Sequence, residues 1–239
     1  MSVIAVIPAR SGSKGFPHKN VARIGGKTLL ELAVNVARSS RYIDDIYVST
    51  DSPAYAELAV AAGASLAGLR SDWLASDHVK TVDVVIDLLG RIGKRYEYLI
   101  LLQPTSPVRT PADVDAALAM LVERAVDAVV SVETLEEPHP EKVKCIEPDG
   151  ILKPYISGAS SEIPRQQLPP AYRLNGAIYA ICTSALLEQR TFLPAKTSAY
   201  RMPKGINIDS EDDFILLRTL FEMGRLDVHG ATNSVDDVG

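Results

Sequence analysis

The sequence predicts an α/β fold built on a mainly parallel sheet with helices on both faces. Short runs rich in Val, Ile and Leu alternate with segments in which apolar residues recur every three or four positions. This alternation is typical of β-α-β units, whose strands are buried on both faces. The chain has 239 residues, 46% of them hydrophobic, which is enough for one large core. We therefore expect a single domain over residues 1–239, with a small insert at about 135–172.

The first half of the chain contains the clearest elements. Residues 3–8 are apolar almost throughout and predict the first strand. Residues 28–38 carry Leu30, Ala33, Val34 and Ala37 on one helical face, which predicts an amphipathic helix that crosses between strands. The alternation continues with a strand at 46–49, helices at 53–62 and 81–92, and a strand at 98–102.

The second half begins with the same alternation and then departs from it. Thr110 followed by Pro111 predicts the start of a helix that runs toward Glu123, and residues 128–132 form a strand. The Pro-rich insert predicts a hairpin of strands at 142–146 and 151–155, which we expect to pack against another subunit or to close over a ligand. Later we expect strands at 177–181 and 205–208, a helix at 212–223, and a frayed tail from about His229.

Composition excludes several classes of protein. There are 25 Lys plus Arg against 30 Asp plus Glu, and this net charge of −5 argues against a nucleic-acid partner. The apolar runs are far shorter than the roughly 20 residues that a membrane span needs. Two cysteines cannot build a disulfide scaffold or a cysteine metal cluster. Because no basic region precedes the first apolar run, we expect a strand there rather than a signal peptide, and a cytoplasmic protein without a membrane partner.

The loop after the first strand carries the strongest functional signal. Ligands of open parallel sheets bind outside the carboxyl ends of the strands, which is where this loop lies. Gly12 and Gly15 allow a tight turn with accessible backbone N–H groups, and Arg10, Lys14 and Lys19 supply three cations. Backbone N–H groups and guanidinium or ammonium groups hold phosphates. The loop therefore predicts a triphosphate site, and a solvated basic loop is the alternative.

Four blocks carry a family resemblance. They are IPARSGSKG at 7–15 with Lys19 and Asn20 beyond it, LLQPTSPVRT at 101–110, PRQQLP at 164–169 and YRLNGAIY at 172–179. Together they resemble the cytidylyltransferases that activate 2-keto-3-deoxy sugar acids, and the last two blocks resemble N-acylneuraminate (sialic acid) cytidylyltransferases in particular. The blocks follow the order of the family and cover nearly the whole chain.

The resemblance implies a Rossmann-like sheet, a dimerisation role for the hairpin insert, and thus a homodimer. It also implies a reaction in which CTP and N-acylneuraminate give CMP-sialic acid (CMP-N-acetylneuraminate) and pyrophosphate, with Mg²⁺ or another divalent ion such as Mn²⁺. A related nonulosonic or 3-deoxy sugar acid is the first alternative, namely legionaminate, pseudaminate, deaminated neuraminate or 3-deoxy-manno-octulosonate. A non-catalytic CTP-binding regulator is the second.

Roles for individual residues follow from the same resemblance. Arg10, Lys14 and Asp209 are the expected catalytic residues. The expected nucleotide-binding residues are Arg10, Ser13, Lys14, Lys19, Asn20, Arg70, Asp77 and Thr81. The expected sugar-binding residues are Gln103, Lys142, Arg165, Arg173, Asn175, Tyr179 and Phe192.

The expected metal site departs from the family pattern. Members commonly carry Asp-x-Asp before the final helix, whereas this chain has Asn207 and Asp209. Side chains alternate along a strand, so on the expected strand both would share one face and approach one ion, with Asp209 as the principal ligand. The amide of Asn207 removes one negative charge from the site. Ser210 and Asp213 predict a helix N-cap rather than further metal ligands.

Overall fold

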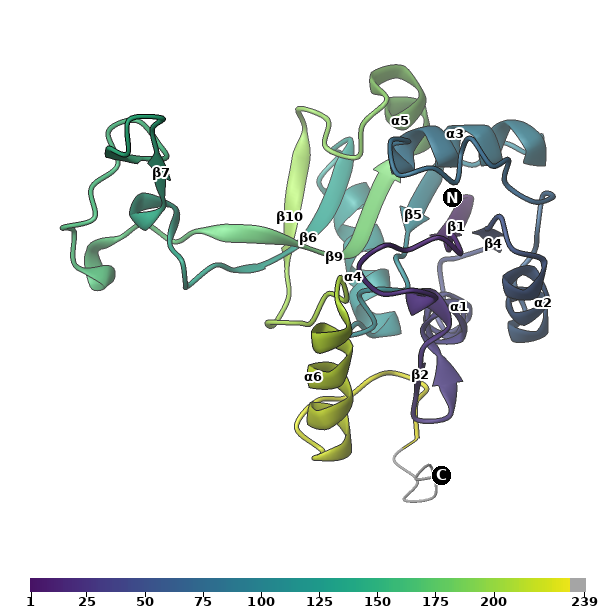
Figure 1. Ribbon diagram of the computed structural model, residues 1–239. Coiled ribbons are helices and arrows are strands. Elements are labelled where there is room, and N and C mark those ends of the chain that lie inside the picture. The colour runs from purple at the N-terminus through teal and green to yellow at the C-terminus, as the bar shows by residue number, and fades with distance from the viewer. Residues whose placement is uncertain (233–239) are drawn as a thin grey trace.

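The structure is a computed structural model that describes residues 1–232. Within these residues, six strands form one sheet in the order β10-β6-β9-β5-β1-β4 (Figure 1). The strands are β1 (Val3–Pro8), β4 (Asp45–Ser49), β5 (Tyr98–Leu101), β6 (Ala128–Thr134), β9 (Tyr172–Cys182) and β10 (Thr197–Arg201). β9 runs antiparallel to β5 and β6, and the other neighbouring pairs run parallel. The mainly parallel α/β fold is confirmed.

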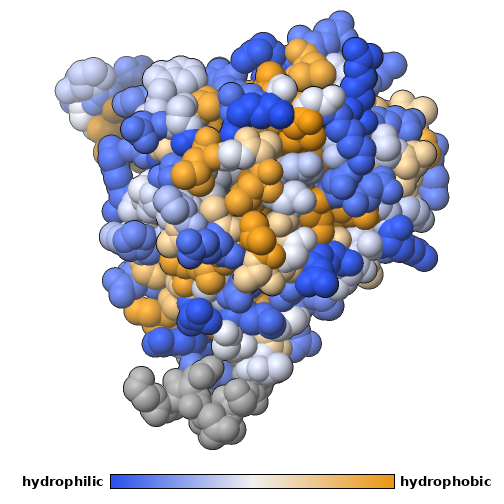
Figure 2. All heavy atoms as spheres, turned by 90° about the vertical axis from the view of Figure 1, so that its right-hand side faces the viewer, coloured by the Kyte–Doolittle hydropathy of each residue, from blue (hydrophilic) through white to orange (hydrophobic). Residues whose placement is uncertain are grey.

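Helices cover both faces of the sheet (Figure 1). On one face the core includes side chains of α1 (Leu29–Arg38), α2 (Pro53–Ala62) and α4 (Pro111–Glu123). On the other it includes side chains of α3 (Thr81–Ile92) and α5 (Thr183–Gln189). β1 is buried on both faces, because the side chains of Val3 and Ala5 pack in the first core and that of Ile4 packs in the second. On the side that carries α2 and α3, the hydrophobic side chains that remain at the surface gather toward the middle (Figure 2).

Local sequence signals set the helix starts. Thr28 caps α1 through a reciprocal capping box with Glu31, and Thr110 caps α4 in the same way with Asp113. The last helix, α6 (Glu211–Glu222), begins at the expected cap, where the Ser210 side chain accepts a hydrogen bond from the Asp213 backbone. α6 packs with α1 and the small β2–β3 hairpin (Arg23–Ile24 and Lys27–Thr28) in a third apolar cluster.

The insert leaves the sheet after β6 and returns at β9. It projects from the body of the molecule and contains a separate two-stranded hairpin, β7 (Lys144–Ile146) and β8 (Leu152–Pro154) (Figure 1). The predicted hairpin is therefore present, although Lys142 belongs to the short 3-10 helix η2 (Pro140–Lys142) instead of the first strand. Another such helix, η3 (Arg165–Gln167), lies nearer β9.

The predicted strand at 205–208 is wrong. These residues form an irregular segment, and the edge strand beside β6 is instead β10, whose sequence TSAYR has too few apolar residues to stand out. The irregular path has a cause, since the Gly205 N–H is bonded to the Glu133 side chain at 2.9 Å and the Ile208 N–H to the Thr105 carbonyl at 2.8 Å.

Two other expectations differ from the structure. α5 and the first five residues of β9 were not expected, because α5 is short and the start of β9 is exposed. The tail was expected to fray from His229, yet Val228 is buried and the Thr232 N–H lies 3.3 Å from the Gly25 carbonyl oxygen. The rest of that prediction falls on residues outside the described part of the chain. None of the helices in residues 1–232 has the length and apolar character needed to cross a membrane.

Candidate active site

The loop after β1 is held in place by hydrogen bonds from neighbouring segments. The Ser11 backbone N–H and hydroxyl donate to the Asp51 carboxylate at 2.8 and 2.5 Å. Asn20 is buried, and its amide Nδ2 donates to the Arg10 carbonyl at 2.9 Å. Because both ends are tied to buried or partly buried partners, the loop presents its cations at the carboxyl end of β1. This is the position that the sequence predicts.

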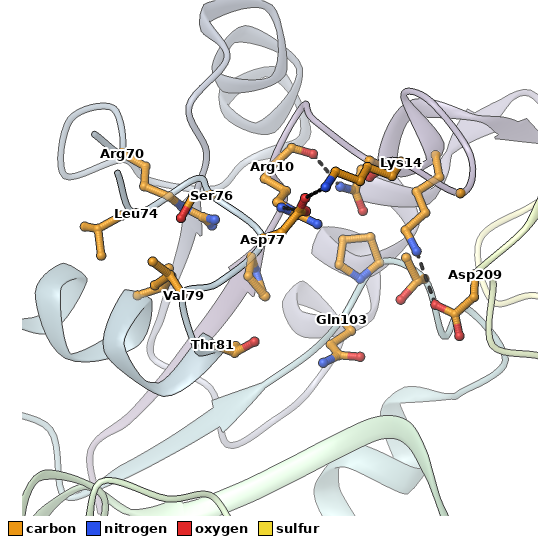
Figure 3. A pocket seen from close by; sticks show the side chains of 18 of the residues that line it. Arg10, Lys14, Arg70, Leu74, Ser76, Asp77, Val79, Thr81, Gln103 and Asp209 are labelled. Atoms are coloured by element: carbon orange, nitrogen blue, oxygen red, sulfur yellow. Dashed lines mark hydrogen bonds and ion pairs between the residues drawn. The ribbon is translucent and has the colours of Figure 1, made fainter. Parts of the chain in front are cut away.

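Arg10 and Lys14 converge on one carboxylate. Arg10 Nη1 lies 2.6 Å from Asp77 Oδ1, and Lys14 Nζ lies 2.6 Å from Asp77 Oδ2 (Figure 3). The hydrogen bonds from Lys14 and Arg10 lower the pKa of Asp77 below its ordinary value. Charge-assisted bonds of this kind suit phosphate oxygens as well as carboxylate oxygens. The two cations therefore meet at a point that already accommodates an anion.

Arg70 provides a third cation deeper in the protein. Its side chain is buried, with Nε 3.2 Å from Ser49 Oγ and Nη2 2.7 Å from the Ser49 carbonyl oxygen. Burial lowers the pKa of Arg70 to about 10, so the guanidinium stays charged at neutral pH. Leu74 and Val79 lie nearby (Figure 3). This end of the site therefore combines a fixed cation with apolar surface.

Asp209 lies on the opposite side of the loop from Asp77 (Figure 3). Lys19 Nζ lies 2.8 Å from the Ile208 carbonyl oxygen and 3.3 Å from Asp209 Oδ1. Asn207 Nδ2 donates to Asp209 Oδ2 at 3.1 Å, and Asn207 Oδ1 accepts from the Ser106 hydroxyl at 2.9 Å. Asn207 and Asp209 are thus neighbours, as expected, although an irregular segment brings them together and not the alternation of a strand.

These side chains line one cavity of about 470 Å³. All of the residues expected to bind the nucleotide line this cavity, together with Gln103, Asn207 and Asp209. The nucleotide set is Arg10, Ser13, Lys14, Lys19, Asn20, Arg70, Asp77 and Thr81. The structure brings these positions together, and the role of each stays a prediction.

Gln103 reaches the cavity from the segment after β5. Arg109 is buried and Nη1 donates to the carbonyl oxygens of Gln103 and Ser106 at 2.7 and 2.6 Å. Burial lowers the pKa of Arg109 to about 9. Gly176 lies beneath this turn with φ +74°, and a Cβ there would meet Ser106 Oγ at 2.9 Å and Gln103 Oε1 at 3.2 Å. The buried Arg109 therefore holds the turn that carries Gln103 through hydrogen bonds, and Gly176 leaves the space that this turn occupies.

A second cavity, of about 390 Å³, adjoins the first. Arg173 and Asn175 of β9 line it, and Asn207 and Asp209 line both cavities. Asn175 is held by the Ser131 hydroxyl, which lies 2.5 Å from its Oδ1. The second cavity thus places an arginine within the surface that continues past Asp209.

Four of the expected sugar-binding residues lie outside both cavities. Lys142 and Arg165 belong to the insert, where Arg165 Nη2 lies 3.3 Å from Glu136 Oε2. Tyr179 and Phe192 have ring centroids 5.8 Å apart and pack against the core beneath α3 and α5. Burial raises the pKa of Tyr179.

The donor set at Asp209 fits a weakly held divalent ion. Asp209 offers one carboxylate whose side chain is 75% exposed, and Asn207 offers an amide. Mg²⁺ is commonly bound by one or two carboxylates together with substrate phosphates and water. No group of three or more His, Cys, Asp or Glu side chains within residues 1–232 is arranged to hold a metal ion by itself. An ion here would therefore depend on a phosphate ligand.

Several residues that shape the site were not found from the sequence. Ser106 and Arg109 fall inside the 101–110 block, but nothing in the sequence shows that one holds Asn207 and the other is buried. Glu133 is only 2% exposed and bonds to both Arg173 and Gly205. The sequence does contain one sign of this role, because Glu133 is a single acid within the apolar run of β6. A buried acid at such a position needs a buried partner.

Comparison with known proteins shows what the chain is similar to. The chain is 35% identical over 219 residues to an N-acylneuraminate cytidylyltransferase of Streptococcus agalactiae, covering 90% of this chain and 52% of that protein. It is 33% identical over 232 residues to a CMP-N,N'-diacetyllegionaminic acid synthase of Legionella pneumophila, covering 94% of this chain and 98% of that protein. The chain therefore spans about half the length of the Streptococcus relative and nearly all of the Legionella relative.

A solved structure agrees on the fold. CMP:2-keto-3-deoxy-manno-octonic acid synthetase complexed with CTP superposes with a TM-score of 0.71 at 18% identity, covering 94% of this chain and all of that one. The sequence model described as "Cytidylyltransferase" matches residues 4–201, which include the loop after β1, the turn after β5 and both ends of the insert. The chain belongs to this cytidylyltransferase family.

Proposed function

We propose that the chain transfers the cytidylyl group of CTP to N-acylneuraminate, which gives CMP-sialic acid and pyrophosphate. One observation carries the proposal: a cavity lined by Arg10, Lys14 and Arg70 meets a second cavity lined by Arg173 at Asp209. A triphosphate in the first cavity and a sugar acid in the second would bring a sugar hydroxyl beside the α-phosphate. Both substrates are anions, and each cavity offers a guanidinium to one of them.

The chemistry follows from this placement. The anomeric hydroxyl oxygen bonds to the α-phosphorus and loses its proton, while the bond from that phosphorus to the bridging oxygen breaks and pyrophosphate leaves on the opposite side. Arg10, Lys14 and Lys19 neutralise the charge that gathers on the phosphate oxygens. Positioning and charge stabilisation supply the rate acceleration, and no covalent enzyme intermediate is needed.

Asp209 would hold a divalent ion, Mg²⁺ or another such as Mn²⁺, with Asn207 beside it. When bound, the ion supplies positive charge to the triphosphate oxygens. Lys19 orients the Asp209 carboxylate through one oxygen and Asn207 through the other, so both residues prepare the site for the ion. The position of the pair at the junction of the two cavities supports this role.

The proposal includes a homodimer in which the insert contacts a second copy. Ile146 of β7 is 74% exposed and Tyr155 beyond β8 is 71% exposed, on an arm that projects from the body (Figure 1). Lys142 and Arg165 lie on the same arm, away from the cavities of their own chain. In such a dimer, the second copy would bury the apolar side chains of the insert. Lys142 and Arg165 of one copy would then lie at the sugar-acid cavity of the other copy. An exposed apolar surface of this kind is typical of an interface.

The proposal names N-acylneuraminate as the sugar acid, and related acids are the alternatives. Legionaminate is the second candidate, because the Legionella relative matches along nearly its full length at an identity similar to that of the Streptococcus relative. Pseudaminate, deaminated neuraminate and 3-deoxy-manno-octulosonate complete the set of related acids.

The test is pyrophosphate release from CTP with each of these five acids, in Mg²⁺ and in Mn²⁺. We expect the highest kcat/KM with N-acetylneuraminate, and a higher value with another acid would reassign the substrate within the same chemistry. Binding of CTP without release of pyrophosphate for any acid would contradict the enzyme and favour a CTP-binding regulator.

A further inference from the structure

Glu133 is a buried acid that the expected chemistry leaves without a role. It lies near the end of β6, it is 2% exposed, and it lines the second cavity. A buried carboxylate is costly unless it is paired and hydrogen-bonded. Its partners are therefore the reason that it persists at this position.

The first partner is Arg173. The two residues face each other directly across the antiparallel β6–β9 pair, where opposed side chains are close enough to interact. Arg173 Nε lies 2.7 Å and Nη2 lies 2.5 Å from Glu133 Oε1. One edge of the guanidinium is therefore fixed against a side chain that cannot move into solvent.

Among residues 1–232, no hydrogen bond or ion pair to the other edge of the Arg173 guanidinium accompanies this contact, and that edge can take a ligand. A guanidinium has five N–H donors in a rigid fork, and Glu133 takes one from Nε and one from Nη2. The donors of Nη1 and the second donor of Nη2 remain, and together they form the end-on pair that binds a carboxylate in bidentate fashion. The Arg173 side chain is 52% exposed and lines the second cavity together with Asn207 and Asp209.

The second partner of Glu133 is the segment that leads to Asp209. Glu133 Oε2 accepts a hydrogen bond from the Gly205 backbone N–H at 2.9 Å. A single buried carboxylate thus fixes both the arginine of the second cavity and the chain that forms its opposite wall. The two oxygens of this one side chain therefore tie Arg173 to the backbone at Gly205.

We propose that Glu133 is a positioning residue that aims Arg173 at the carboxylate of the sugar acid. The inference rests on the proposed function, since it concerns the sugar-acid cavity of the same reaction. An arginine without this anchor samples many rotamers, and the conformational entropy lost when it is ordered then weakens substrate binding. Glu133 orders the Arg173 side chain before the sugar acid binds, so binding loses less conformational entropy.

The test compares KM values for the two substrates in Glu133→Gln. Gln keeps the size of the side chain and removes its charge. We expect the KM for the preferred sugar acid to rise about tenfold or more, equivalent to about 1.4 kcal/mol, while the KM for CTP changes less than about twofold. The matched control is Glu123→Gln, which alters an exposed acid at the end of α4 and should leave both KM values unchanged.

A double-mutant cycle separates this role from a structural one. In an Arg173→Ala background, Glu133→Gln should raise the sugar-acid KM by less than about twofold, because Glu133 acts through Arg173. Glu133→Asp keeps the charge and should recover part of the affinity that Gln loses. CTP titration by calorimetry checks that each variant is folded.

Three outcomes would overturn the inference: an unchanged sugar-acid KM in Glu133→Gln, an equal rise in both KM values, or loss of CTP binding in both the Gln and the Asp variant. Failure of the proposed function has a different signature, because the unaltered protein would then release no pyrophosphate with any acid.

Discussion

Gly15 and Asp209 touch in the folded protein, although one follows the first strand and the other precedes the last helix. A Cβ added at Gly15 would lie 2.7 Å from the Asp209 carbonyl oxygen, which is closer than side-chain carbons approach a backbone. Lys19 reinforces the contact by donating to the Ile208 carbonyl at 2.8 Å. The loop after β1 therefore packs directly against the segment that carries the acid expected to hold the metal.

Gly15→Ala should weaken the divalent-ion site. The added methyl must displace the Asp209 backbone, so we expect about tenfold more Mg²⁺ to be needed for half-maximal activity, a change equivalent to about 1.4 kcal/mol. Gly12→Ala is the matched control in the same loop, because no atom lies within 4 Å of its added Cβ. Equal Mg²⁺ titrations for the two variants would show that the contact has no functional consequence.

Arg10→Ala should reduce turnover with CTP by on the order of a hundredfold or more. Removal of one preorganised partner for transition-state charge costs roughly 3 kcal/mol. Steady-state kinetics measure the effect, and Arg124→Ala, an exposed cation at the end of α4, provides the comparison. If the kinetics of Arg10→Ala matched those of the unaltered protein, Arg10 would have no place in the phosphate site.

Asn207→Asp should make the protein more dependent on the ion. The Asn207 Nδ2 to Asp209 Oδ2 contact of 3.1 Å would become a contact between two carboxylates, which repel each other more than the single Lys19 ammonium offsets unless a divalent cation binds them. We therefore expect a lower Tm than the unaltered protein without Mg²⁺, a larger rise in Tm when Mg²⁺ is added, and half-maximal activity at a lower Mg²⁺ concentration. Thermal unfolding with and without the ion measures this, and a rise equal to that of the unaltered protein would place residue 207 away from the metal.

The Asp77 contacts should stabilise the protein only above acidic pH. Lys14 and Arg10 lower the pKa of Asp77 below 3.8 in the folded state, so the folded protein holds the acid's proton less tightly than the unfolded chain does. That stabilisation is complete above the unfolded pKa and is lost as the pH falls through the lower folded pKa. The Tm difference between the unaltered protein and Asp77→Asn should therefore be present at pH 6 and shrink as the pH falls below the ordinary pKa of an Asp carboxyl.

Asp72→Asn is the control for that experiment, since it removes an exposed acid from the same segment. A Tm difference for Asp77→Asn that is constant from pH 6 to pH 3 would show that the ion pairs with Arg10 and Lys14 do not stabilise the folded state.

Ile146→Lys should convert the proposed dimer into monomers. The substitution places a charge on the exposed apolar face of the insert, where a second copy would bury it at high cost. Sedimentation velocity over a range of protein concentrations measures the change. Val60→Lys, on an apolar side chain of α2 that is 54% exposed, should leave the association state as it is. A monomer in the unaltered protein would rule out the dimer.

The loop residues of the first cavity could be predicted from local pattern, whereas Arg70, Asp77 and Thr81 were expected from the family resemblance. Arg10, Lys14 and Lys19 belong to one loop, and the position of that loop follows from the strand that precedes it. Gln103 directly follows the predicted strand at 98–102, and its expected role in the site came from the family resemblance. Periodicity is strongest in buried parallel strands, so both positions are fixed by the most reliable signal in the chain.

Arg173, Asn175, Asn207 and Asp209 of the second cavity were expected as site residues, but the shape of that cavity could not be predicted because tertiary contacts define it. The irregular path of 205–208 results from the Glu133 and Thr105 contacts, which no local pattern encodes. The same holds for Arg173, whose guanidinium is oriented by a residue 40 positions away. The family resemblance suggested Tyr179 and Phe192 as lining of the sugar pocket; their rings pack on each other against the core, and their part in sugar binding stays a prediction.

A crystal structure of the protein with CTP tests the central claim most directly. The account predicts the triphosphate between Arg10 and Lys14, the cytosine toward Arg70, and the α-phosphate on the side of Asp209. Asp77 would then have given up its contacts with the two cations. A nucleotide bound in another part of the molecule, or an Asp209 carboxylate directed away from the phosphates, would contradict the account.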